Sequence, residues 1–139
     1  MPEVYSIEPV DGFPFVHEER VRWRDLDGFG HVNNAVYLTY LEQSRFAYLE
    51  HLGLVDGLRT MTMILARVQI DFRSPLGAGD VLRIGVRPAR LGTKSFELEH
   101  SLRAGDRLVA EATGVLVGYD YDSGESIAIP DHWRRSLAA

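Results

Sequence analysis

The sequence predicts an α+β fold in which one antiparallel sheet wraps around a single long helix. Three observations indicate this class. The stretch from Asn33 to Leu52 has helical periodicity and is apolar around most of its circumference, as expected of a buried helix. Four later stretches alternate apolar and polar residues, as half-buried strands do. The connections between them are short, which favours antiparallel neighbours because parallel pairs need long crossovers.

The elements are expected in a simple order. An irregular lead-in precedes a first strand from Val16 to Arg24. The long helix follows, with Asn33 or Asn34 as its cap and Gly53 in the left-handed position after its last turn. The alternating stretches then predict strands over residues 66–73, 82–87, 96–102 and 107–119. Small residues on one face of the last strand suggest a close neighbour such as the helix, and Pro130 begins a short helical tail.

Composition narrows the class of protein. The chain has 139 residues, of which 45% are hydrophobic and 25% charged, so we expect a single domain over residues 1–139. The absence of cysteine excludes a disulfide framework, a thiolate zinc site and a cysteine nucleophile. A net charge of −5 disfavours nucleic acid as a partner. The sequence contains neither a membrane-spanning apolar stretch nor a signal peptide, so no membrane partner and a cytoplasmic location are expected.

Familiar catalytic motifs are missing. The sequence has no Gly-x-Ser-x-Gly elbow and no phosphate-binding loop of the Gly-x-x-x-x-Gly-Lys type. The segment Gly28–Gly30 resembles the start of a dinucleotide fingerprint, but Asn33 stands where the third glycine belongs. The five histidines lack the spacing of metal ligands, so no metal site is expected.

One polar segment, Arg24 to Asn34, joins the first strand to the start of the predicted helix. The first N–H groups of a helix lack partners and carry partial positive charge, so they can hold a developing oxyanion. A nearby carboxylate could activate water or attack a carbonyl itself, and Gly28 and Gly30 allow a ligand close to the backbone. The alternative interpretation is a polar turn with a helix cap, which carries no chemistry.

The run Val21–Tyr37, followed by Tyr40-Leu41-Glu42 and Arg45, resembles the signature of the hotdog-fold thioesterases, in particular the 4-hydroxybenzoyl-CoA thioesterase-like acyl-CoA thioesterases. The resemblance extends over nearly the whole chain, since Asp71–Pro75, Gly79-Asp80 and Ile129-Pro130 also fit. It implies a five- or six-stranded antiparallel sheet around one long central helix. It also implies a homodimer or homotetramer with active sites between subunits, which agrees with the free edges of the predicted sheet.

The resemblance also implies roles for individual residues. Asp27 matches the catalytic aspartate, as nucleophile or general base, and Asn34 matches the residue whose backbone N–H polarises the thioester carbonyl. His31 is expected to orient the carboxylate or the water. Gly30 and Tyr37 belong to the same motif and are expected to contact substrate. Three basic residues around a later loop either meet the phosphates of coenzyme A or form a solvated face: Arg87, Arg90 and Lys94.

We therefore predict hydrolysis of an acyl-CoA or acyl carrier protein thioester to a free acid, with no cofactor other than the coenzyme A of the substrate. The acyl group stays open. One alternative is an acyl-thioester hydratase or dehydratase on the same fold, for which His31 and Glu42 would be the catalytic pair. Another is a non-catalytic acyl-CoA binding protein.

Several residues allow two interpretations. Asp25 is expected to pair with Arg22 or Arg24 rather than to share the site. Glu42, alternatively a catalytic base, is expected to pair with Arg45 one helical turn later, and His100 is expected to be a satisfied core histidine. Four apolar side chains belong either to the core or to an acyl pocket: Trp23, Phe29, Met61 and Met63.

Overall fold

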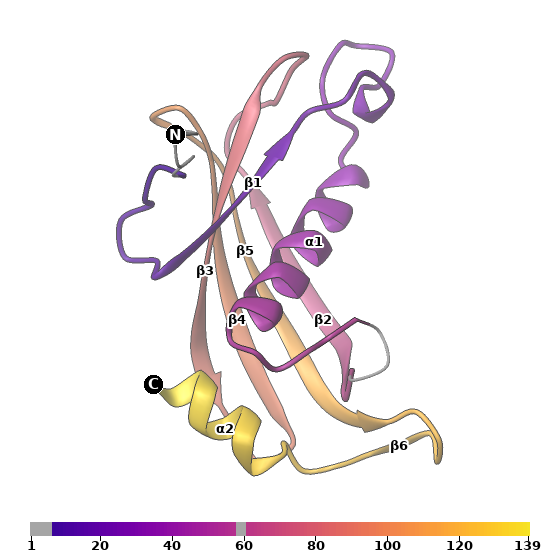
Figure 1. Ribbon diagram of the computed structural model, residues 1–139. Helices are drawn as coiled ribbons and strands as arrows, with labels where there is room; N and C mark the ends of the chain where they lie inside the picture. Colours follow the sequence, from indigo (N-terminus) through magenta and orange to yellow (C-terminus); the bar gives the residue numbers. More distant parts are fainter. Residues whose placement is uncertain (1–6, 58–60) are drawn as a thin grey trace.

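The computed structural model describes residues 7–57 and 61–139. The elements follow one another as β1 (Phe15–Arg20), the 3-10 turn η1 (Trp23–Asp25), α1 (Val36–His51), β2 (Met63–Phe72), β3 (Val81–Leu91), β4 (Ser95–Ala104), β5 (Arg107–Asp120), β6 (Glu125–Ser126) and α2 (Asp131–Ala138). The six strands form one antiparallel sheet, and α1 lies across one face of it (Figure 1). The predicted α+β class is confirmed.

The strand order is β1-β3-β4-β5-β2, with the short β6 paired to β5. The core lies between the sheet and α1, where alternate residues of β3 and β4 are fully buried together with Leu41 and Leu49 of the helix. Leu82, Ile84 and Val86 alternate into this core as the sequence predicts. Trp133 of α2 closes one end of the core beside Phe96, and Pro130 precedes that helix as expected.

The start of α1 differs from the prediction. Residues 33–35 form a turn, and the regular helix begins at Val36. The Asn33 side chain does cap, but it accepts the N–H of Ala35 at 3.0 Å and so stabilises the turn that leads into the helix. The helix ends at His51, and Gly53 has the positive φ of 74° that its expected position requires.

The first strand is shorter than predicted. It ends at Arg20, because the Asp25 carboxylate accepts the backbone N–H of Arg22 at 2.9 Å and closes the chain into η1. As a result Trp23 is 85% exposed and Phe29, in the following turn, is 89% exposed. The prediction that these two aromatic side chains belong to the core is wrong, since both project into solvent. Their place in an acyl pocket stays a prediction.

The strand β2 lies at one edge of the sheet and, within the part of the chain that the structure describes, pairs only with β5. Its large apolar residues Ile64, Leu65 and Phe72 are exposed. On β5, the close neighbour of Gly118 is the Ile127 backbone and not the helix, because a Cβ on this glycine would clash with the Ile127 carbonyl. None of the helices in residues 7–57 and 61–139 is long and apolar enough to cross a membrane.

Candidate active site

The loop between η1 and α1 folds back on itself. Leu26 and Val32 form an antiparallel bridge, and the Asp27 N–H donates to the His31 carbonyl at 2.8 Å. Gly30 has a φ of 81°, a conformation that is strained for residues with a Cβ, and this lets the turn reverse. The Val32 N–H donates to the Leu76 carbonyl at 2.8 Å, which ties the loop to the segment before β3. The loop is therefore held at both ends.

The Asp27 carboxylate is fixed by this turn. Its Oδ1 accepts the backbone N–H of Phe29 at 2.8 Å and that of His31 at 3.3 Å. The other oxygen, Oδ2, accepts no hydrogen bond from any residue that the structure describes. The residue is exposed. One oxygen therefore sets the orientation of the group, while the second is available to a water molecule or a carbonyl carbon.

The backbone N–H groups around the start of α1 differ in whether they have a hydrogen-bond acceptor. Those of Asn33, Ala35, Val36, Tyr37 and Leu38 all donate to acceptors of this chain. The N–H of Asn34 has no acceptor among the described residues. It is therefore a free donor at the positive end of the helix, where it can bind an oxyanion.

A cavity of about 330 Å³ brings the loop and the helix start together. Four residues predicted from the sequence line it: Asp27, His31, Asn34 and Tyr37. Gly30 is not among the lining residues; its contribution is the turn that positions His31. The Tyr37 side chain is buried, which raises the pKa of its hydroxyl, and its ring meets Phe72 edge to face at 5.0 Å.

The opposite wall of this cavity was not predicted from the sequence. That wall consists of Phe72 from the end of β2 and of Arg73, Ser74 and Pro75 after it. The signal was present, since Asp71–Pro75 is part of the family resemblance. This segment reaches the cavity only because α1 and β2, which are far apart in the sequence, make contact at Tyr37 and Phe72. Periodicity and spacing do not reveal such a contact.

Asp25 stabilises the loop instead of contributing to the cavity. It is buried, and its carboxylate accepts the hydroxyl of Tyr40 at 2.7 Å, the Arg22 backbone N–H at 2.9 Å and the Arg22 guanidinium at 3.1 Å. Burial opposes ionisation, but these hydrogen bonds outweigh it and hold the pKa of Asp25 below its ordinary value. The predicted pairing with Arg22 is confirmed.

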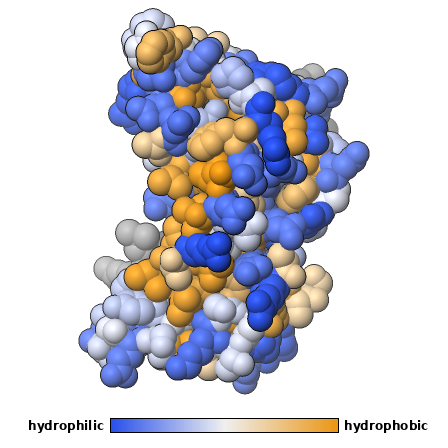
Figure 2. All heavy atoms as spheres, turned by 180° about the vertical axis from the view of Figure 1, so that it is seen from behind, coloured by the Kyte–Doolittle hydropathy of each residue, from blue (hydrophilic) through white to orange (hydrophobic). Residues whose placement is uncertain are grey.

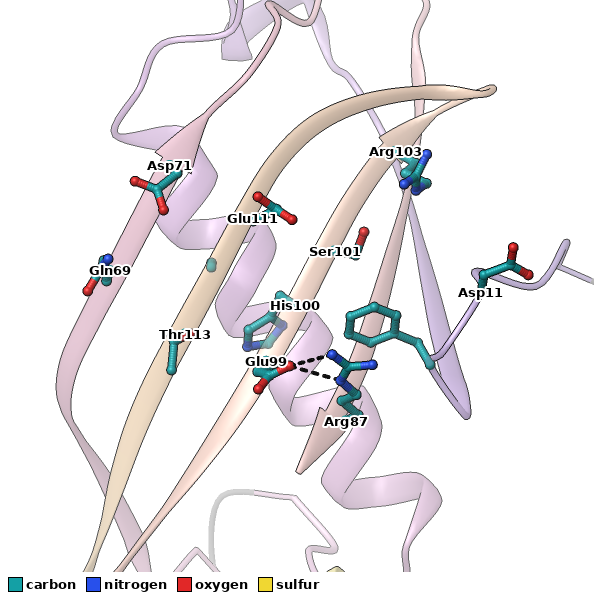
Figure 3. A pocket seen from close by; sticks show the side chains of 12 residues that line it. Asp11, Gln69, Asp71, Arg87, Glu99, His100, Ser101, Arg103, Glu111 and Thr113 are labelled. Atoms are coloured by element: carbon teal, nitrogen blue, oxygen red, sulfur yellow. Dashed lines mark hydrogen bonds and ion pairs between the residues drawn. The ribbon is translucent and has the colours of Figure 1, made fainter. Parts of the chain in front are cut away.

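The three basic residues predicted to meet coenzyme A phosphates lie elsewhere in this chain. Arg87 is on the face of the sheet turned away from α1, where its guanidinium donates to Glu99 at 2.6 and 2.9 Å and to the Gly12 carbonyl (Figure 3). It borders a polar cavity of about 390 Å³ on that face. Arg90 and Lys94 are exposed near the β3–β4 hairpin, at the end of the sheet where α2 packs. One chain does not bring these residues to Asp27.

The catalytic pair required by the hydratase alternative is not assembled within the chain. His31 lines the cavity at the start of α1, whereas Glu42 lines a separate groove between α1 and β2. The predicted ion pair between Glu42 and Arg45 is also wrong, because no ion pair joins them within 4 Å among the described residues. Met63 is buried in the core and Met61 packs against it, as the core interpretation predicts, and both side chains also line this groove.

His100 is buried against α1, as predicted, but only one of its two ring nitrogens has a hydrogen-bond partner among the described residues. Its Nδ1 lies 3.4 Å from Ser44 Oγ, while Nε2 has no partner within the described structure. Burial, with a smaller contribution from the charge of Arg45, lowers the pKa of His100 to about 3. The ring is therefore neutral at physiological pH. Within residues 7–57 and 61–139, no cluster of three or more His, Cys, Asp or Glu side chains is placed to hold a metal ion.

The sheet wrapped around α1 and the loop before that helix define a hotdog-fold thioester hydrolase. Comparison with known proteins supports this class and gives the family. A model of the Thioesterase-like superfamily matches residues 21–137, and the chain belongs to that superfamily.

Individual relatives agree with this assignment. The chain is 30% identical over 125 residues to the long-chain acyl-CoA thioesterase FadM of Escherichia coli, covering 85% of this chain and 92% of the relative. It is 28% identical over 128 residues to a 1,4-dihydroxy-2-naphthoyl-CoA hydrolase of Synechococcus, covering 86% of each. A thioesterase from Thermus thermophilus, solved with coenzyme A and zinc, superimposes with a TM-score of 0.84 at 37% identity, covering 92% of this chain and all of the other. The predicted thioester hydrolase is confirmed.

Proposed function

We propose that this protein hydrolyses acyl-CoA thioesters to free carboxylic acids and coenzyme A, with Asp27 as nucleophile or general base and the Asn34 N–H as oxyanion donor. The observation that carries the proposal is that Asn34, whose backbone N–H donates to no described residue, and Asp27, whose Oδ2 accepts no hydrogen bond, line one cavity. Thioester hydrolysis needs both groups, because negative charge develops on the carbonyl oxygen as the carbon is attacked.

Two routes use these groups. In the first, Asp27 Oδ2 takes a proton from water, the hydroxide attacks the thioester carbon, and the C–S bond breaks to release coenzyme A. In the second, Oδ2 attacks the carbon itself, the thiolate leaves, and water then hydrolyses the mixed anhydride. Label in the Asp27 side chain after one turnover in ¹⁸O-labelled water would establish the second route, because only attack of water on the Asp27 carbonyl of the anhydride puts it there. His31 would hold the water in either case.

The rest of the functional proposal follows from this chemistry. A carboxylate, water and an amide suffice for hydrolysis, so we expect no cofactor beyond the coenzyme A of the substrate. Arg87, Arg90 and Lys94 stay predicted phosphate contacts and would have to come from another copy of the chain to reach this site. An acyl carrier protein thioester is an alternative donor. The cysteine-free composition suits the reducing cytoplasm, where we expect the protein to act.

We further propose that the chain forms a homodimer or homotetramer through the free edge of β2. Long edge strands with exposed apolar side chains favour pairing with another strand. Phe72 supports this choice, since it is 47% exposed on that edge and also lines the cavity, so a second copy would border the site. Analytical ultracentrifugation should give an oligomer, and Ile64→Lys should shift it toward monomer with loss of activity.

The decisive test removes a single backbone N–H. Asn34→Pro deletes the proposed oxyanion donor without breaking an internal hydrogen bond, and Asn34→Ala is the matched control that keeps the N–H. With short-, medium- and long-chain and aromatic acyl-CoAs, thiol release by the Pro variant should fall about 100-fold in kcat, while the Ala variant retains most of the rate.

Two results would contradict the proposal. A folded Asn34→Pro variant as active as Asn34→Ala would remove the oxyanion role. Thermal stabilisation by coenzyme A with no turnover of any thioester would instead indicate a binding protein.

A further inference from the structure

A groove of about 580 Å³ lies between α1 and the start of β2, separate from the Asp27 cavity. Its walls are mainly apolar and include Phe46 and Leu49 of the helix and Met63 and Leu65 of the strand. Its size is that of pockets which hold small ligands. The groove is on the flank of the molecule that is hollowed and rich in hydrophobic side chains when seen from behind (Figure 2).

One cation faces this apolar groove. Arg45 is only 8% exposed and lines the groove, yet its guanidinium has no hydrogen-bond partner among the described residues. Burial lowers the pKa of Arg45, and the charge of Glu42, one turn earlier, opposes this shift without forming an ion pair. The guanidinium nitrogens of Arg45 are not fully buried, so they remain accessible from the groove, which the carboxylate of Glu42 also lines. The groove therefore offers an accessible cation to an anionic ligand.

The groove and the catalytic cavity are both lined by residues of α1 and β2, at different positions along these two elements. Tyr37 and Phe72 border the cavity, while the later residues of α1 and the earlier residues of β2 border the groove. In Figure 1 the helix crosses over β2, and the start of α1 meets the end of the strand where the rings of Tyr37 and Phe72 make contact. At about 1.5 Å per residue, the helix rises about 14 Å between Val36 and Arg45, and its side chains lean back toward its start. An acyl group whose carbonyl is bound at Asn34 could extend between α1 and β2 as far as Arg45.

We propose that the groove receives the far end of the acyl group and that Arg45 binds a carboxylate there. The inference rests on the proposed thioesterase function and names its substrate class as acyl-CoAs whose chain ends in a second carboxylate. The apolar walls suit the methylene chain, and methionine adapts to its shape. The planar guanidinium matches a carboxylate with two parallel hydrogen bonds. Arg45 is thus a specificity-determining residue.

Binding is measured with coenzyme A thioethers, which cannot be hydrolysed. The thioethers are compared in pairs of equal chain length, between about eight and fourteen atoms. One member of each pair ends in a carboxylate and the other in a methyl group. Wild-type protein should bind the carboxylate member at least about tenfold more tightly at the best length, as expected for a charged hydrogen bond. In Arg45→Met, which keeps the aliphatic packing, the preference should reverse. Arg45→Lys should keep part of it, and Arg135→Met, on the exposed surface of α2, should not alter it.

The matching thioesters then test turnover separately. If binding shows the predicted preference but no thioester is hydrolysed, the proposed function fails and the inference about the groove stands. If wild type lacks the preference, or Arg45→Met leaves it unchanged, the inference is wrong whatever the turnover. If Arg45→Met instead dissociates the oligomer and leaves selectivity intact, Arg45 meets a second copy and the inference is also wrong.

Discussion

Asp25 and Asp27 are separated by one residue, but their surroundings differ in almost every respect. Asp25 is 2% exposed, and both of its carboxylate oxygens accept hydrogen bonds, from Tyr40 and from Arg22. Asp27 is exposed, and only one of its oxygens is used, by two backbone N–H groups of its own turn. The same side chain therefore stabilises structure in one place and remains available for chemistry in the other.

The difference arises from the local chain path. The turn η1 directs Asp25 inward, against Tyr40 of the buried helix, and the reversal at Gly30 leaves Asp27 at the mouth of the cavity. The Asp25 carbonyl also accepts the Asn33 N–H at 2.9 Å, so the buried residue holds the start of α1 where Asp27 can use it. The backbone of the buried residue thus helps to position the helix start beside the exposed Asp27.

The largest effect is expected from Asp27→Asn. The variant keeps an oxygen that can accept the Phe29 N–H but loses the charge, so kcat should fall at least about 100-fold, as for the loss of a general base or nucleophile. The free energy of unfolding should change by less than about 1 kcal/mol, because the side chain is exposed. Thiol release and urea unfolding measure the two quantities. A variant with full activity would show that Asp27 is not catalytic.

Asp25→Asn should show the opposite pattern. The amide cannot accept all the hydrogen bonds that the buried carboxylate accepts, so the free energy of unfolding should fall by about 2 kcal/mol. Under conditions where the variant is folded, kcat should fall much less than in Asp27→Asn. Tyr40→Phe removes one of these hydrogen bonds and should cost about 1 kcal/mol. Loss of activity equal to that of Asp27→Asn, without loss of stability, would contradict the structural role.

The pH dependence of stability should separate the two carboxylates further. Because the folded-state pKa of Asp25 is lowered, its contribution is fully present above the unfolded value of about 3.9 and is lost as the pH falls through the folded value. The difference in unfolding free energy between wild type and Asp25→Asn should therefore be constant from about pH 8 to about pH 5 and shrink below about pH 4. Urea unfolding across this range measures it. A difference that grows in acid would refute the assignment.

Much of this arrangement can be predicted from the sequence, because the fold depends on periodicity. The alternation at Leu82, Ile84 and Val86 and the apolar circumference of α1 suffice for the sheet and the helix. The Asp27 loop is recognisable because its short-range pattern carries both a family resemblance and a helix start. Sequence reasoning fails where a single hydrogen bond redirects the chain, as when Asp25 ends β1 early and leaves Trp23 in solvent.

Contacts between remote elements are the second limit. The wall formed by Phe72–Pro75 and the buried position of Arg45 both depend on how β2 lies against α1. Helical spacing suggests that Arg45 pairs with Glu42, since residues three apart share a face. The structure instead turns the guanidinium into a groove whose other wall comes from a strand far along the chain. No local pattern encodes that neighbour.

The smallest expected effect tests how firmly the turn fixes Asp27. Gly30 has a φ of 81°, so Gly30→Ala is strained by about 1 kcal/mol even though no atom lies within 4 Å of the added Cβ. The variant should relieve this strain by shifting the His31 N–H away from Asp27 Oδ1, which should lower kcat several-fold with a similar small loss of stability. Gly28→Ala is the matched control, because Gly28 has no positive φ and equally open surroundings. Since both substitutions add one methyl group to the same exposed loop, equal activities would mean that the second backbone hydrogen bond to Asp27 is dispensable and that Phe29 alone orients the carboxylate.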